Sequence, residues 1–73
     1  MFSIDKETLK ALRDRFTSGT RVELVHMNDF QAPPIGTQGT VKSVDDMGTI
    51  HIRWDSGSSL GVVYGEDVCK IIE

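Results

Sequence analysis

The chain has too few cysteines for an internal disulfide and no apolar run long enough to span a membrane. It has one cysteine, Cys69, among 73 residues, so no internal disulfide can form. No apolar run approaches the ~20 residues of a membrane span. Charged residues from Asp5 to Lys10 interrupt the region where an export signal needs an apolar core. We therefore expect one cytoplasmic domain, residues 1–73, with no membrane association.

Positive charge is scarce in most of the chain. The net charge is −3 at neutral pH. Residues 1–18 carry four cations against three acids, whereas residues 19–73 carry four cations against eight acids. Nucleic-acid binding depends on lysine and arginine side chains that neutralise phosphates. The sequence therefore predicts that nucleic-acid binding is weak or absent.

A short amphipathic helix is predicted from Asp5 to Phe16, within an N-terminal segment of residues 1–18. Asp5 can cap its first turn, and Leu9, Leu12 and Phe16 share one face. Because helices this short are marginal in isolation, the helix needs tertiary contacts through its apolar stripe to be stable. We expect it to pack on the rest of the domain. Docking on a partner or on a second copy is the alternative, and the expected state is a monomer or a weak dimer.

The remainder, residues 19–73, is a series of short β-segments punctuated by glycines. Alternation is clearest over residues 49–55, where Ile50, Ile52 and Trp54 share one side. This pattern predicts that Trp54 lies in the core. The predicted strands cover residues 21–27, 39–45, 49–55, 59–64 and 68–72.

Two irregular features are predicted between these strands. Val41 and Val44 are three residues apart, which breaks the alternation and indicates a bulge or a sharp bend near Lys42-Ser43. The loop over residues 28–38 holds both prolines of the chain, and prolines block strand pairing. Phe30 and Ile35 in this loop are interpreted as apolar anchors that fold it onto the core.

Five short strands, a long first loop and tight turns match the plan of an SH3-like barrel. In that plan, hairpins join the second, third and fourth strands, and closure limits exposed edges. The turn at Ser56-Gly57 leaves no room for the helix that an OB-type barrel places there. The predicted fold class is mainly β: a small SH3-like five-stranded barrel preceded by one short N-terminal α-helix.

The residues with reactive side chains do not form a catalytic or metal-binding pattern. His26 and His51 lack metal-ligand spacing, and His26 shares the apolar side of its strand, which predicts a half-buried side chain. Cys69 lies in an apolar strand with no base beside it in sequence. The acidic residues of the β-segments fall in turns, where a carboxylate bonds the local backbone. They are Asp29, Asp45, Asp46, Asp55, Glu66 and Asp67. We expect no enzymatic activity, no cofactor and no metal ion.

Aromatic and acidic residues suggest a binding surface instead. SH3-like barrels that bind peptides line a groove with exposed aromatic side chains. Met27, Phe30 and Tyr64 are the apolar candidates, and the acidic turns that contain Asp46 and Asp67 suit a basic peptide. The predicted function is binding of a protein or peptide segment. The alternative is a nucleic-acid-associated accessory protein.

Several short motifs occur together in the second part of the chain. They are Arg21-Val22-Glu23-Leu24, Gly36-Thr37-Gln38-Gly39-Thr40-Val41, Val44-Asp45-Asp46-Met47-Gly48, Trp54-Asp55-Ser56-Gly57-Ser58-Ser59-Leu60 and Gly65-Glu66-Asp67. This combination resembles the uncharacterised bacterial family called domain of unknown function 4314, over residues 18–73. The resemblance implies a small β-barrel, common in bacteria and their mobile elements, with no established activity and with no family catalytic residues to carry over. The alternative function is therefore expected in a bacterial or mobile-element system.

Overall fold

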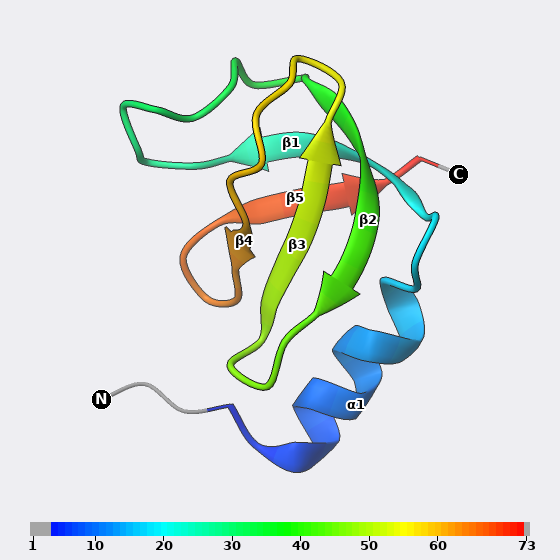
Figure 1. Ribbon diagram of the computed structural model, residues 1–73. Coiled ribbons are helices and arrows are strands. Elements are labelled where there is room, and N and C mark those ends of the chain that lie inside the picture. The colour runs from blue at the N-terminus through cyan, green and yellow to red at the C-terminus, as the bar shows by residue number, and fades with distance from the viewer. Residues whose placement is uncertain (1–3, 73) are drawn as a thin grey trace.

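One helix and five strands make up the computed structural model, which describes residues 4–72 (Figure 1). All five strands belong to one antiparallel sheet, in the order β4-β3-β2-β1-β5. The predicted mainly β class with one N-terminal helix is confirmed. In chain order the elements are α1 (Lys6–Arg15), β1 (Arg21–His26), β2 (Gln38–Val44), β3 (Thr49–Trp54), β4 (Val62–Val63) and β5 (Val68–Ile71).

The sheet is open, which differs from the closed barrel that the sequence predicts. Within residues 4–72, no strand pairing joins the two edge strands, β4 and β5. The backbone of Val63 explains the gap. Its N–H donates to the Asp67 carboxylate at 2.9 Å, and its C=O accepts from the N–H groups of Glu66 and Asp67. Because the turn uses these groups, β4 ends after two residues, and the predicted strand over residues 59–64 is much shorter than expected.

The sheet curves strongly, so that β2 and β3 cross in front of β1 and β5 (Figure 1). The register between β2 and β3 shifts between Val41 and Ser43, which confirms the predicted bulge and strengthens the local twist. Gly39 permits close packing beside it. A Cβ atom there would lie 2.7 Å from Ile52 Cγ2 and 2.9 Å from Trp54 Cε3.

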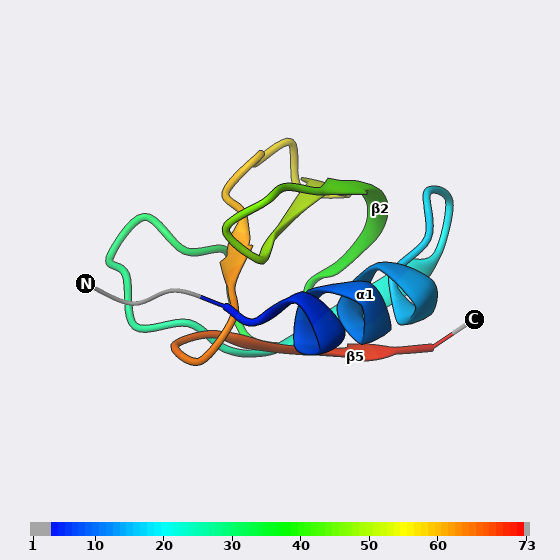
Figure 2. The same ribbon diagram turned by 90° about the horizontal axis from the view of Figure 1, so that it is seen from below.

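The helix completes the core of the domain. Asp5 caps the helix by accepting the Thr8 N–H at 2.8 Å. Figure 2 shows α1 between β2 and β5 in that view. Leu12 and Phe16 are buried in the domain's own core, as predicted, whereas Leu9 is half-buried and lies outside the core cluster. The buried core residues are Leu12, Phe16, Val22, Leu24, Val41, Ile50, Ile52, Trp54 and Val62.

The residues that hold the long loop between β1 and β2 against the domain differ from those predicted. Phe30 and Ile35 are 98% and 62% exposed, so the interpretation of these side chains as core anchors is wrong. Pro33 is buried instead, and the Gly36 N–H donates to the Leu24 carbonyl at 2.8 Å. A proline and a backbone hydrogen bond therefore hold this loop and leave its large apolar side chains in solvent.

We expect Trp54→Ala to lower the free energy of unfolding by about 3–5 kcal/mol, the usual cost of such a core truncation. Trp54 is only 1% exposed, and its indole N–H donates to the Leu60 carbonyl at 2.8 Å. Phe30→Ala is the matched control, because it also truncates an aromatic side chain but an exposed one, and we expect a change within ~0.5 kcal/mol. Urea denaturation followed by circular dichroism measures both. Equal losses in the two variants would contradict a core centred on Trp54.

Candidate binding surface

Two neighbouring hollows lie where the sheet is open. The first, the acidic hollow, has a volume of about 330 Å³ and is lined by His26, Asn28, Glu66 and Asp67. The second, the apolar groove, has a volume of about 170 Å³ and lies between α1, β4 and β5. Asp67, in the turn between β4 and β5, lines both of them, and the two hollows together are here called the seam surface.

The apolar groove exposes part of the hydrophobic core. Leu12, Phe16 and Val62 line it and are buried. Tyr64 and Val68 also line it, and they are 39% and 49% exposed. An apolar cavity of about 150 Å³ is large enough to hold benzene. The groove therefore has room for one apolar side chain of a partner.

The acidic hollow combines two carboxylates with very different surroundings. Asp67 accepts the Val63 N–H at 2.9 Å and so holds the turn between β4 and β5. Within residues 4–72, the Glu66 carboxylate has no hydrogen bond or ion pair, and its side chain is exposed. Glu66 is therefore available to an incoming cation, whereas Asp67 is already held by the backbone.

His26 is exposed at the rim of the acidic hollow, so the prediction that it is half-buried is wrong. The register between β1 and β5 shifts between Leu24 and His26. Such a shift breaks the simple alternation of buried and exposed positions from which the burial was predicted.

The structure brings together only part of the predicted binding surface. Tyr64 and Asp67 both line the apolar groove. Met27 is partly buried against the core, and Phe30 projects from the loop between β1 and β2. Asp46 lies in the turn between β2 and β3, where Arg13 Nη2 approaches its carboxylate to 2.7 Å. Asp46 and Phe30 do not line either hollow of the seam surface.

The residues of α1 and β5 that line the groove are not among the binding residues predicted from the sequence. The sequence places Leu12 and Phe16 on the packed face of the helix and Cys69 in an apolar strand, and Cys69 is half-buried in the structure. The apolar spacing of these residues indicates that they face inward. It carries no signal that one side of the packed layer stays open to solvent, because that depends on the missing β4–β5 pairing.

The prediction that the turn carboxylates hold local backbone is confirmed for Asp29, Asp45 and Asp67. It is wrong for Asp46 and Asp55, which form ion pairs with Arg13 and Arg21. Asp29 accepts the Gln31 N–H at 2.8 Å, and Asp45 accepts the Met47 N–H at 3.0 Å. A hydrogen bond from His51, together with these backbone bonds, lowers the pKa of Asp45 below its ordinary value. In the part of the chain that the structure describes, no group of three or more His, Cys, Asp or Glu side chains is placed to hold a metal ion.

The sequence profile of the family Domain of unknown function (DUF4314) matches residues 5–72. The chain belongs to this family. The match includes α1, so the helix is part of the DUF4314 domain, and the extent of residues 18–73 expected from the motifs was too short. None of the curated proteins compared with the chain matches it. Among residues 4–72, no helix is long and apolar enough to cross a membrane.

Cys69 in the apolar groove is expected to react slowly. Burial raises the pKa of its thiol to about 11, whereas a free cysteine has a pKa of about 8.5. The thiolate is the reactive form, so at pH 7 we expect alkylation by iodoacetamide to be on the order of 100-fold slower than that of N-acetylcysteine. Because the thiolate fraction rises with pH, the rate should increase up to about pH 11. Mass spectrometry of the alkylated chain measures the rate, and equal rates at pH 7 would contradict the raised pKa.

Proposed function

We propose that this DUF4314 domain is a non-enzymatic module that binds an extended, positively charged segment of another protein along the seam surface. The observation that carries the proposal is the open seam, where a groove lined by core side chains lies beside an unpaired strand edge. Exposed apolar surface next to a polar rim is typical of protein interaction sites.

The edge of β5 supports binding of an extended segment. β5 pairs with β1 on one side only, so its other edge offers backbone N–H and C=O groups to an added strand. Val68, Ile71 and Ile72 are large apolar residues that are exposed on or just after this strand. A segment lying along β5 would cover these side chains and place one of its own in the apolar groove.

The acidic hollow supports a positively charged partner. The Glu66 carboxylate is exposed and unpaired within residues 4–72, Asp67 lies beside it, and the chain has a net charge of −3. Complementary charge speeds association and selects partners. A lysine or arginine of the segment would therefore lie in the acidic hollow while an apolar neighbour fills the groove.

Ion pairs reduce the number of cations that a nucleic acid could contact. A phosphate-binding surface needs lysine and arginine side chains that are free to contact the backbone of the nucleic acid. Three of the cations near the helix are instead engaged by carboxylates: Lys10 by Asp14, Arg13 by Asp46 and Arg21 by Asp55.

The test uses a fluorescein-labelled synthetic peptide that alternates lysine with leucine, and fluorescence anisotropy measures its binding. We expect Val68→Ser to weaken binding about tenfold, since burial of one valine contributes about 1.5–3 kcal/mol. We expect Glu66→Gln to weaken it up to about fivefold, in line with an exposed ion pair. A bound peptide should also slow the alkylation of Cys69, because Cys69 lines the groove.

Two variants serve as matched controls for this experiment. Ile35→Ser makes the same kind of change as Val68→Ser at an exposed apolar residue of the loop between β1 and β2, and Glu7→Gln removes a carboxylate from α1. Both should leave binding unchanged. Equal binding of a peptide with glutamate in place of lysine, or equal losses in the controls, would contradict the proposal. Tighter binding of a DNA or RNA oligonucleotide would favour the nucleic-acid alternative.

A further inference from the structure

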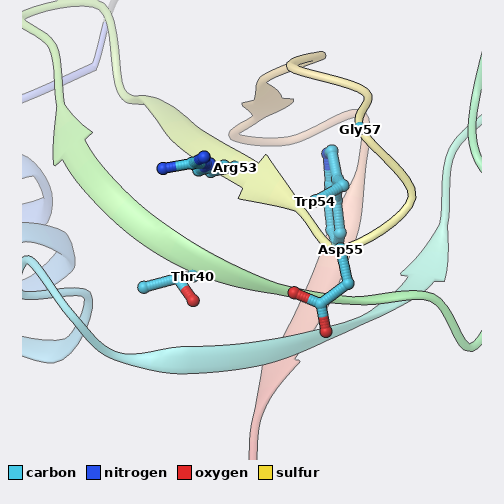
Figure 3. Close-up of a pocket in the computed structure, with 5 residues that line it drawn as sticks. All are labelled: Thr40, Arg53, Trp54, Asp55 and Gly57. Atoms are coloured by element: carbon cyan, nitrogen blue, oxygen red, sulfur yellow. The ribbon is translucent and has the colours of Figure 1, made fainter.

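A separate hollow of about 540 Å³ lies on the outer face of β2 and β3 (Figure 3). It is lined by Thr40, Arg53, Trp54, Asp55 and Gly57, none of which lines the seam surface. Thr40 and Arg53 alternate with buried neighbours along their strands, so their side chains project away from the core. Figure 3 shows the side chains of Thr40, Arg53 and Asp55 around the hollow.

A bidentate ion pair holds one side of the hollow. Arg21 Nη2 lies 2.6 Å from Asp55 Oδ2, and Arg21 Nη1 lies 2.9 Å from Asp55 Oδ1. Paired bonds of this kind fix geometry as well as charge. The Arg21 guanidinium lowers the pKa of Asp55, so the carboxylate stays ionised, and Arg21 balances its charge.

The same arginine orients Thr40. Arg21 Nη1 donates to Thr40 Oγ1 at 2.9 Å, so the hydroxyl acts as an acceptor toward Arg21. A threonine hydroxyl carries one hydrogen of its own, and that hydrogen is then left to donate to another group. Thr40 therefore offers a hydrogen-bond donor on the outer face, and its hydrogen bond from Arg21 fixes the position of the hydroxyl oxygen.

Arg53 supplies the second set of donors. It lies directly opposite Thr40 in the β2–β3 register, and Cβ atoms at such positions are about 4.5–5.5 Å apart. Within residues 4–72, the Arg53 side chain has no hydrogen bond or ion pair. Its guanidinium presents several N–H donors in a planar fork that matches a carboxylate.

We propose that this hollow binds a carboxylate group of a partner protein, with the Arg53 guanidinium and the Thr40 hydroxyl as its donors. The two arginines and Asp55 together carry one excess positive charge, which a single carboxylate neutralises. A phosphate group or a nucleic-acid strand would bring more negative charge close to Asp55, and the whole chain already has a net charge of −3. The carboxylate belongs either to an acidic side chain or to a free C-terminus.

The test is a titration of ¹⁵N-labelled protein, in which amide chemical shifts are followed by NMR. Three short peptides serve as probes: an amidated peptide with one glutamate, the same peptide with glutamine, and a peptide without acidic side chains that ends in a free carboxylate. We expect saturable shifts at the amides of Thr40, Arg53, Asp55 and Gly57 with at least one carboxylate peptide. The glutamine peptide should cause none. Which carboxylate peptide binds identifies the source of the group.

Three variants decide whether the named residues make the contact. Arg53→Gln should weaken binding at least tenfold, and Thr40→Val should weaken it severalfold while keeping the shape of the side chain. Lys42→Gln is the matched control, because it removes an exposed cation from β2 that does not line the hollow. It should leave binding unchanged. The amide spectrum of each variant verifies that the fold is intact.

Several outcomes would overturn the proposal. They are equal shifts from the glutamine peptide, unchanged binding in Arg53→Gln, and equal losses in Arg53→Gln and Lys42→Gln. A short oligothymidylate that shifts the same amides at lower concentration than the peptides would show that the hollow selects phosphate. Because these variants leave the seam surface untouched, this result is independent of the function proposed for that surface.

Discussion

The fold depends on how the backbone of one residue, Val63, is hydrogen-bonded. Its N–H is taken by the Asp67 carboxylate and its C=O by the turn that follows. β4 therefore ends early, and β5 begins without a partner on that side. A closed barrel would have covered the edge of β5 and the core side chains beneath it. The open seam, the apolar groove and the proposed binding mode all follow from this short turn.

The helix supplies two side chains to the core of this open sheet. Leu12 and Phe16 belong to the buried core and come from the helix, outside the sheet. Arg13 attaches the helix to the β2–β3 turn through Asp46. The family match begins at Asp5, which agrees with a helix that is part of the domain rather than an appendage. A 73-residue chain has little surface to bury, so this contribution matters for stability.

Local spacing predicted much of the fold. The helix stripe, the clean alternation around Trp54 and the broken alternation at Val41 each describe a few neighbouring residues, and each was confirmed. Predictions that needed knowledge of distant contacts were less successful. Phe30 was interpreted as an anchor because it is apolar, yet Pro33 is the buried residue of its loop. His26 was placed inside by alternation, which the register shift with β5 interrupts.

By itself, the sequence determined the helix, the approximate strands, the acidic charge and the family, because periodicity, composition and motifs are properties of the chain alone. Only the tertiary structure decided that the sheet stays open and that Asp67 lines two hollows. It also decided that Asp55 is paired with Arg21 while Arg53 has no partner within residues 4–72. These features depend on strand register and on competition between side chains for backbone groups. Strand register and the Arg21–Asp55 pair join residues far apart in sequence, so no local pattern records them. The Val63–Asp67 bond is local, but its effect on the sheet depends on β5, which pairs with the distant strand β1.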